Sequence, residues 1–189
     1  GEQSAEESLD EILEHLEGAH MLFVAAGMGG GTGTGAAPVI AEIAREKGIL
    51  TVGVVTNPFS TEGGYRKQYA EDGLAELKKY VDTLLIINND KLIEVYGDLT
   101  FTQAFGKANE VLNTATKGIA EVISQHLLVN IDLNDARKVL ENSGTAVMGQ
   151  AIAEGENRAI EAVIGALDSP LLNDNDITGA QQVLLKIVT

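Results

Sequence analysis

The sequence has no cysteine among its 189 residues, and aromatic residues make up only 4% of it. Without cysteine the chain can form neither a disulfide nor a thiolate metal site. Because aromatic residues are scarce, aliphatic side chains have to fill the core. No apolar run is long enough to span a membrane, and no signal peptide is recognisable. The simplest expectation is therefore a cytoplasmic protein that does not insert into membranes.

Basic residues are also few: 13 lysines and arginines stand against 28 aspartates and glutamates, which gives a formal net charge of −15. This charge argues against nucleic acids and anionic membranes as direct partners. A nucleotide would have to be held by local backbone amides and a few basic side chains. The hydrophobic content of 44% and mean hydropathy of +0.06 are sufficient for a real core. A chain of this length can form one ordinary domain or parts of two.

A run of glycine and threonine, GGGTGTG at residues 29–35, follows an apolar segment and precedes a helix-like one. A strand, a glycine turn and a helix are therefore expected in that order. Glycine lets the backbone approach an anion closely, and a helix N-terminus offers free N–H groups and a favourable dipole. A flexible linker is the alternative, but linkers do not lie between a buried strand and an amphipathic helix. The backbone amides predicted to hold the β- and γ-phosphates of a nucleotide are those of Gly29, Gly30, Gly31, Thr32, Gly33, Thr34 and Gly35.

Two common phosphate-binding patterns do not fit this run. A P-loop needs Lys followed by Ser or Thr after its last glycine, whereas two alanines follow Gly35. The dinucleotide pattern is formally met at residues 31–36. However, the next expected strand ends in TNP at residues 56–58, without the acid that would bind the ribose. An NAD-dependent or nucleotide-sugar enzyme is therefore a weak alternative.

Apolar periodicity predicts alternating strands and helices, which implies a parallel sheet with helices on its faces. A long helix is predicted over 102–125, because its apolar residues keep helical spacing for more than six turns. The other expected helices cover about 4–18 (with a capping box at Ser4–Glu7), 36–47, 65–80 (with an interruption considered at Gly73), 89–97, 134–142 and 155–168. The expected strands cover about 20–26, 49–56, 83–87, 144–153 and 183–189. Residues 1–125 are assigned to a first domain, and residues 126–189 to the incomplete start of a second.

The motif AGMGGGTGTGAAP at residues 26–38 resembles the signature of the FtsZ family, the bacterial relatives of tubulin. The resemblance continues, in the same order, through VVTNPF (54–59), EGGYR (62–66), NDKL (89–92), AFGKAN (104–109), NIDLND (130–135) and SPLL (169–172). It implies an α/β fold with a Rossmann-like parallel GTPase sheet of the tubulin/FtsZ type, a long central helix and the start of a second α+β domain. On this basis 1–125 is the C-terminal part of the GTPase domain, and 126–189 holds the catalytic loop and the beginning of the C-terminal domain. Only the middle portion of such a protein is represented.

The resemblance also implies roles for single residues in nucleotide binding. Glu62 and Arg66 would contact the ribose and phosphates, Asn89 and Asn109 would recognise guanine, and Phe105 would stack on the base. The residues alone leave other interpretations open. Glu62 and Arg66 can form an exposed i, i+4 pair, Asn89 can cap a helix, Asn109 can be an exposed helix position, and Phe105 can belong to the core.

Asn130, Asp132 and Asp135 follow the long helix. The resemblance implies that this loop enters the nucleotide site of the next subunit, where the acids polarise the water that attacks the γ-phosphate. From the residues alone, acids at a helix start are equally well caps and partners of the helix dipole. The base site and the acids would lie near opposite ends of the long helix. Hydrolysis would then require head-to-tail stacking, and such a heterologous interface produces open filaments.

The expected function is that of a GTP-binding and GTP-hydrolysing protein, whose subunits polymerise into the filaments of the bacterial Z ring at mid-cell. The expected cofactors are GTP or GDP and Mg²⁺, and the expected partners are further copies of the chain and other cell-division proteins. No metal-ligating residues are assigned, because the three histidines are dispersed. The alternative is a truncated, non-catalytic piece that binds or caps such filaments or needs a complementing half.

Overall fold

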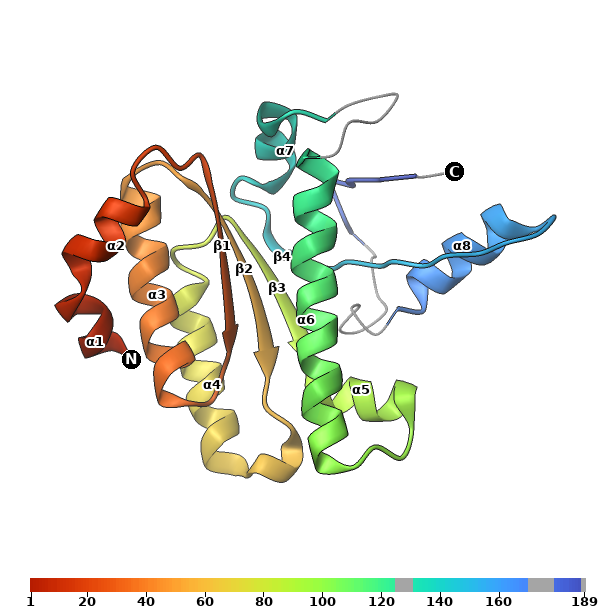
Figure 1. Cartoon of the computed structure of the whole chain (residues 1–189), viewed down its shortest axis with the longest axis horizontal. Helices are drawn as coiled ribbons and strands as arrows, with labels where there is room; N and C mark the ends of the chain where they lie inside the picture. Colours follow the sequence, from red (N-terminus) through yellow and green to blue (C-terminus); the bar gives the residue numbers. More distant parts are fainter. Residues whose placement is uncertain (125–130, 170–178, 188–189) are drawn as a thin grey trace.

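The structure is a computed structural model that describes residues 1–124, 131–169 and 179–187. Four strands alternate with helices along the chain (Figure 1). The elements are α1 (Glu2–Glu7), α2 (Leu9–His15), β1 (Met21–Gly27), α3 (Gly31–Glu46), β2 (Leu50–Asn57), the 3-10 helix η1 (Ser60–Glu62), α4 (Gly64–Leu77), β3 (Thr83–Asn88), α5 (Asn89–Tyr96), α6 (Phe101–Ser124), α7 (Leu133–Leu140), β4 (Gly144–Ala146) and α8 (Arg158–Leu167).

The strands form one parallel sheet in the order β1-β2-β3-β4. Met21 pairs with Leu50 at the start of β1 and β2, and Thr83 at the start of β3 pairs with both Val52 and Gly144. Helices α3 and α4 cover one face of the sheet, and α6 runs across the other (Figure 1). The carboxyl ends of the strands therefore meet at one edge of the sheet, and α3 and α5 begin at that edge.

Aliphatic side chains form a core on each face of the sheet. One cluster joins β2 and β3 to α6 and α7, and the other joins β1, β2 and β3 to α3 and α4. Because β2 and β3 are covered on both faces, their sequences are almost continuously apolar. The largest fully buried side chains are leucines, isoleucine, valines and threonines, in agreement with the shortage of aromatic residues: Leu50, Leu77, Leu84, Leu85, Ile87, Leu92, Val52, Val54, Val55, Thr51 and Thr83.

The parallel α/β sheet and the long helix are confirmed. Strands β1, β2 and β3 begin and end within about a residue of the predicted bounds, and α6 has 24 residues. At 1.5 Å per residue, α6 is about 36 Å long. It spans the sheet from the edge where the strands end to the edge where they begin.

Several local expectations are wrong. Ser4 lies inside α1, whose N-cap is Gly1, and the first helical segment is broken at Ser8. Helix α4 passes through Gly73 without interruption. The strand predicted from residue 144 is only the three residues of β4, and no strand occurs in the described residues 179–187. Segments near the ends of the chain therefore differ most from their sequence patterns.

The predicted domain boundary after residue 125 stays a prediction. Beyond it, Ala136 and Leu140 of α7 join the core on the α6 face, and β4 pairs with β3. Helix α8 has no buried residue and projects away from the sheet in Figure 1. Within the described parts of the chain, no helix combines the length and apolar character that crossing a membrane would require.

Candidate functional site

The candidate site lies at the carboxyl edge of the sheet, where three strands lead into loops or helices. The glycine run follows β1, η1 follows β2, and α5 follows β3. The strand register places Gly27 beside Thr56, and Asn57 beside Asn88. Open parallel sheets bind ligands at this edge, because the N-termini of the crossover helices point there.

Helix α3 begins inside the glycine run, at Gly31, with Gly30 as its N-cap. No side-chain hydrogen bond caps this end within the described residues, and the first turn contains no acidic residue. The first amides of a helix have no partner within the helix itself. The N–H groups of residues 31–33 are therefore available to an anion, and the helix dipole favours negative charge there.

The glycines of the run differ in what surrounds them. A Cβ added at Gly33 would collide with the carbonyl oxygen of Gly27, and one at Gly29, where φ is +94°, would lie 2.9 Å from the carbonyl oxygen of Arg66. A Cβ added at Gly31 would meet nothing within 4 Å. Close packing explains why glycine is required at positions 29 and 33, but it does not explain the glycine at position 31. The space on the Cα side of Gly31 is open, as a bound anion requires, while Gly1 packs against the carbonyl oxygens of Gly31 and Thr32.

Three residues of the predicted run contact other parts of the protein: Gly29 through its amide, Thr34 through its hydroxyl oxygen and Gly35 through close packing. Thr34 is only 5% exposed, and its Oγ1 accepts a hydrogen bond of 2.9 Å from the Gly29 amide. Gly35 lies against α1, because a Cβ there would be 2.7 Å from the Glu2 nitrogen. The Gly29 amide therefore shapes the turn and is not free for a phosphate. The part of the run left open for an anion is residues 30–33.

Gly73 of α4 makes room for Thr34. A Cβ at Gly73 would collide with Cγ2 of Thr34 and lie 3.0 Å from Cε of Met28. We expect Gly73→Ala to displace Thr34 and lower the free energy of unfolding by about 1–3 kcal/mol, although alanine favours helices. Urea unfolding measures this change. The matched control is Gly106→Ala in α6, where an added Cβ meets nothing within 4 Å; equal stability of the two variants would contradict the packing role.

Glu62 and Arg66 form an ion pair in which Nη1 lies 3.0 Å from Oε2. Oε1 of Glu62 accepts a 2.8 Å hydrogen bond from the Phe59 amide. The Glu62 side chain is 9% exposed and that of Arg66 is 56% exposed. The i, i+4 pair is thus present, with Glu62 in η1 and Arg66 in α4. Glu62 fixes the loop after β2 and orients a guanidinium that remains open to solvent; its contact with a ribose stays a prediction.

Asn89 is 3% exposed, and its Oδ1 has no hydrogen-bond partner in the described part of the chain. The cap of α5 is the preceding residue, Asn88, whose Oδ1 accepts from the Asp90 amide at 3.1 Å. The interpretation of Asn89 as a helix cap is therefore wrong. A buried oxygen without a partner is unfavourable by roughly 1–3 kcal/mol, which a donor on a ligand would recover.

Phe105 packs edge-to-face against two other rings. Its centroid lies 5.1 Å from that of Phe59, after β2, and 4.8 Å from that of Phe101, at the start of α6. Asn109, one turn later, is exposed. Phe105 is half-buried and contacts these rings, but it belongs to none of the core clusters among the described residues. Stacking on a base and recognition of guanine by Asn109 stay predictions.

The sequence analysis missed Asn57, the last residue of β2. Its Oδ1 is also buried without a partner among the described residues. A second missed residue is Asp90, whose Oδ1 accepts a 2.9 Å hydrogen bond from the Ser60 amide and so joins α5 to η1. The sequence could have indicated these two residues only by their positions, because polar residues at or just after the end of a parallel strand lie at the ligand-binding edge of the sheet.

Asp132 and Asp135 lie at the start of α7, at the far end of α6 from Phe105 (Figure 1). Oδ1 of Asp132 accepts from the Asp135 amide at 2.8 Å, which confirms the capping interpretation for Asp132. Asp135 is 53% exposed at its side chain and pairs with Lys138 at 3.1 Å. Asn130 lies outside the described residues. Within one molecule the acids and the glycine run are at opposite edges of the sheet.

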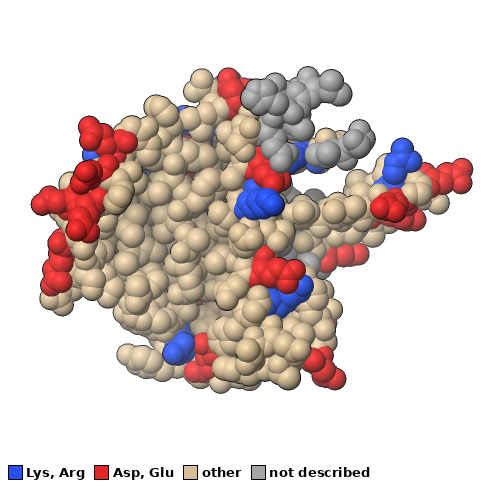
Figure 2. All heavy atoms as spheres, in the orientation of Figure 1, with Lys and Arg blue, Asp and Glu red and all other residues tan. Residues whose placement is uncertain are grey.

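The surface charge is uneven. Figure 2 shows acidic side chains gathered over α1 and α2, and the first 44 residues contain no lysine or arginine. The described residues contain no group of three histidine, aspartate or glutamate side chains that could hold a metal ion. Phosphates at this site would therefore depend mainly on backbone amides and on Arg66, whose helix begins beside the glycine run.

Known protein families match both ends of the chain. The model of the Tubulin/FtsZ family, GTPase domain, matches residues 1–97, and that of the FtsZ family, C-terminal domain, matches residues 144–189. The chain is 53% identical over 188 residues to the cell division protein FtsZ of Wigglesworthia glossinidia brevipalpis and 54% identical to that of Buchnera aphidicola subsp. Acyrthosiphon pisum. Each alignment covers 99% of this chain and 49% of the relative. The chain thus spans about half the length of the curated relatives it matches.

Solved structures show the same fold. An empty FtsZ dimer from M. jannaschii superposes with a TM-score of 0.87 at 46% identity, over 90% of this chain and 50% of that one. CetZ from Methanosaeta thermophila strain DSM 6194 superposes with a TM-score of 0.74 at 25% identity, over 88% of this chain and 48% of that one. The sheet, the long helix α6 and the glycine run therefore have counterparts in known structures.

Proposed function

Because the chain belongs to the Tubulin/FtsZ family, we propose that it is a GTP-binding and GTP-hydrolysing protein whose subunits polymerise head to tail into filaments for bacterial cell division. The observation that carries the proposal is the open first turn of α3. There the amides of residues 31–33 have no side-chain cap, and a Cβ added at Gly31 would meet nothing within 4 Å, although Gly1 packs against the carbonyl side of residues 31 and 32.

The remaining contacts fit a guanine nucleotide. The unpartnered Oδ1 of Asn89 requires a donor, and guanine carries N–H donors on its Watson–Crick edge. Arg66 would place its guanidinium on the phosphates, because the start of α4 touches the glycine run at Gly29. Mg²⁺ would be bound largely by phosphate oxygens and water, as is usual for this ion. It would offset the charge of the phosphates.

We propose that hydrolysis takes place between two molecules. The first turn of α3 and the first turn of α7 lie at opposite edges of the sheet, and the long helix α6 runs between these edges. Asp135 of one molecule, together with Asp132 and with Asn130 of the same sequence motif, would therefore act on the nucleotide of the next. Their part is to orient and polarise the attacking water, since phosphoryl transfer depends mainly on positioning and charge placement. The expected place of action is the cytoplasm at the division site, together with other division proteins.

The test is the dependence of GTP turnover on protein concentration. We expect phosphate release per molecule to rise steeply with concentration, together with GTP-dependent polymers measured by sedimentation. Turnover per molecule that stays constant would contradict hydrolysis between subunits. GTP binding without turnover or polymers would favour the non-catalytic alternative, and binding of NAD in place of GTP would contradict the proposed function itself.

A further inference from the structure

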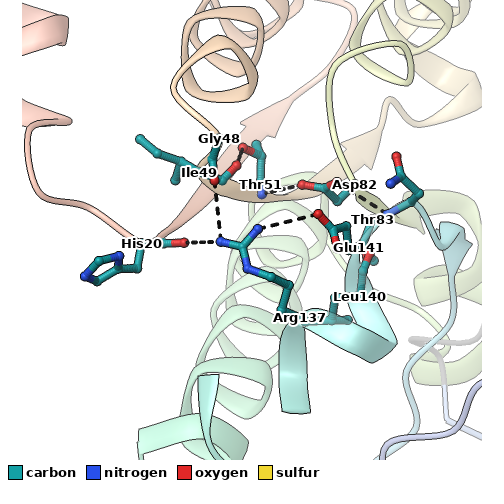
Figure 3. Close-up of polar contacts among 10 residues, drawn as sticks. His20, Gly48, Ile49, Thr51, Asp82, Thr83, Arg137, Leu140 and Glu141 are labelled. Carbon is teal, nitrogen blue, oxygen red and sulfur yellow. Dashed lines mark hydrogen bonds and ion pairs between the residues drawn. The ribbon is translucent and has the colours of Figure 1, made fainter. Parts of the chain in front are cut away.

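We propose that Arg137 is a positioning residue for the hydrolytic acids, and that it holds the acid-bearing half of α7 against the edge of the sheet where the strands begin. The inference rests on the proposed hydrolysis between subunits. Arg137 follows Asp135 by two residues in α7 and belongs to none of the sequence motifs that indicate the function. Its side chain leaves the helix towards the strands β1 and β2 (Figure 3).

The guanidinium of Arg137 contacts three separate segments. Its Nη2 donates to the carbonyl oxygens of His20 at 3.3 Å and of Gly48 at 3.5 Å. Its Nη1 lies 3.6 Å from Oε1 of Glu141, the residue that directly follows α7. His20 precedes β1 directly, and Gly48, with φ +68°, lies in the turn between α3 and β2. One side chain thus joins α7 to the starts of two neighbouring strands.

The other end of α7 is attached independently by β3. Oγ1 of Thr83 donates to the carbonyl oxygen of Leu140 at 2.6 Å, and Oδ1 of Asp82 accepts from the Asn142 amide at 3.3 Å (Figure 3). Oδ2 of Asp82 accepts from the Thr51 amide at 2.9 Å, so the same carboxylate also binds β2. Because these contacts and the buried Leu140 remain without Arg137, the helix should stay attached when the arginine is removed.

The first half of α7 is packed against the sheet by Ala136, which is fully buried in the core on the α6 face. The hydrogen bonds described above for Asp132, Asp135 and Lys138 stay within the helix. Arg137 is therefore the polar group through which the turn carrying the acids is oriented against β1 and β2. Its bonds are long and its side chain is 31% exposed, so their contribution to stability is small. Misplacing a catalytic group by about 1 Å, however, can slow a reaction roughly 100-fold.

The identity of the residue matters for this role. A planar guanidinium offers five N–H donors in a fixed fork, so it can serve two carbonyl oxygens and a carboxylate together. A lysine ammonium is a point charge on a flexible stem and cannot keep the same geometry. Arg137→Lys should therefore retain part of the positioning, and Arg137→Ala should lose it.

The experiment compares Arg137→Ala and Arg137→Lys with Arg45→Ala in the full chain. Arg45 is the matched control, because its Nη1 also donates to a carbonyl oxygen, that of Lys79, away from α7. We expect Arg137→Ala to lower kcat at saturating GTP and protein by about 10- to 100-fold, with unchanged GTP affinity and an unchanged number of binding sites per chain. Arg137→Lys should be intermediate, and Arg45→Ala should match the wild type.

A second measurement does not depend on turnover. The chain contains no cysteine, so spin labels can be attached at Asn134→Cys in α7 and Glu46→Cys in α3, both of which are exposed. We expect the distance distribution between the labels to broaden or shift in Arg137→Ala and to stay the same in Arg45→Ala.

The outcomes separate this inference from the proposed function. An unchanged distance distribution overturns the positioning role, as does a loss of nucleotide-binding sites with an unchanged kcat per site. A wild-type chain that binds GTP but does not hydrolyse it contradicts the proposed function. The distance distribution between the two spin labels then still shows whether Arg137 positions α7 against the sheet.

Discussion

Replacing Gly31 with alanine is expected to weaken GTP binding at least about tenfold, which corresponds to about 1.4 kcal/mol, without loss of fold stability. Gly31 is the first residue of α3, and a Cβ there meets no protein atom within 4 Å. Alanine is favoured over glycine in helices by up to about 1 kcal/mol, so the free energy of unfolding should stay the same or rise. The added methyl group would occupy the space in which we place the phosphates.

Calorimetric titration with a non-hydrolysable GTP analogue and urea unfolding measure the two effects separately. Gly33→Ala is the informative comparison, because its Cβ would collide with the carbonyl oxygen of Gly27. That variant should lose stability by about 1–3 kcal/mol and lose binding with it. If Gly31→Ala binds the analogue as tightly as the wild type, the phosphates do not lie on the first turn of α3 and the candidate site is wrong.

The second large effect is expected for Asp135→Ala, which should reduce GTP turnover by about 10²- to 10⁴-fold while GTP remains bound. Asp135 lies at the opposite edge of the sheet from the glycine run, so its loss should not alter affinity. Its ion pair with Lys138 is exposed, and such pairs contribute about 0–1 kcal/mol. Asp132 is a poorer target, because removing this N-cap would lower stability by about 1 kcal/mol.

Phosphate release at saturating protein and GTP provides the measurement. Asp10→Ala is the matched control, since Asp10 also lies in the first turn of a helix and is exposed. Mixing Asp135→Ala with Gly31→Ala gives a sharper result. At a GTP concentration well below the dissociation constant of Gly31→Ala, only Asp135→Ala holds the nucleotide and only Gly31→Ala supplies the acids. Equal mixtures should then recover turnover, at most about a quarter of the wild-type rate for random head-to-tail order. No recovery, with both variants present in the same polymers, would contradict hydrolysis between neighbours.

The sequence was sufficient to predict the sheet, because buried parallel strands are apolar along their whole length and glycine marks the turn that follows β1. The sequence was insufficient to predict elements that form only when another part of the protein packs or pairs with them. Residues 183–187 are rich in apolar residues, as a strand is, but a strand forms only beside another strand, and none pairs with them in the described structure. The capping box at Ser4 failed for a related reason, since the same residues are compatible with the interior of a helix.

Within the candidate site, the exact residue at which a helix begins determines which side chains face the ligand, and the sequence does not define that residue. Two consecutive asparagines lie where β3 joins α5. The last residue of β3, Asn88, caps α5, and Asn89 is buried with an oxygen that has no partner among the described residues. Thr34 was expected to face the ligand, yet the register of α3 turns it inward to the Gly29 amide. Both outcomes depend on where a helix begins, which composition and spacing define only to within a residue or two.

The length of α6 has a consequence for timing. If a bound GTP can be hydrolysed only after another molecule docks onto it, the last subunit at one end of a growing polymer cannot hydrolyse its GTP. Each added subunit would then bring a new terminal GTP that has not been hydrolysed. The time since the next subunit docked would determine when a subunit hydrolyses its GTP and when its contact with that neighbour can weaken.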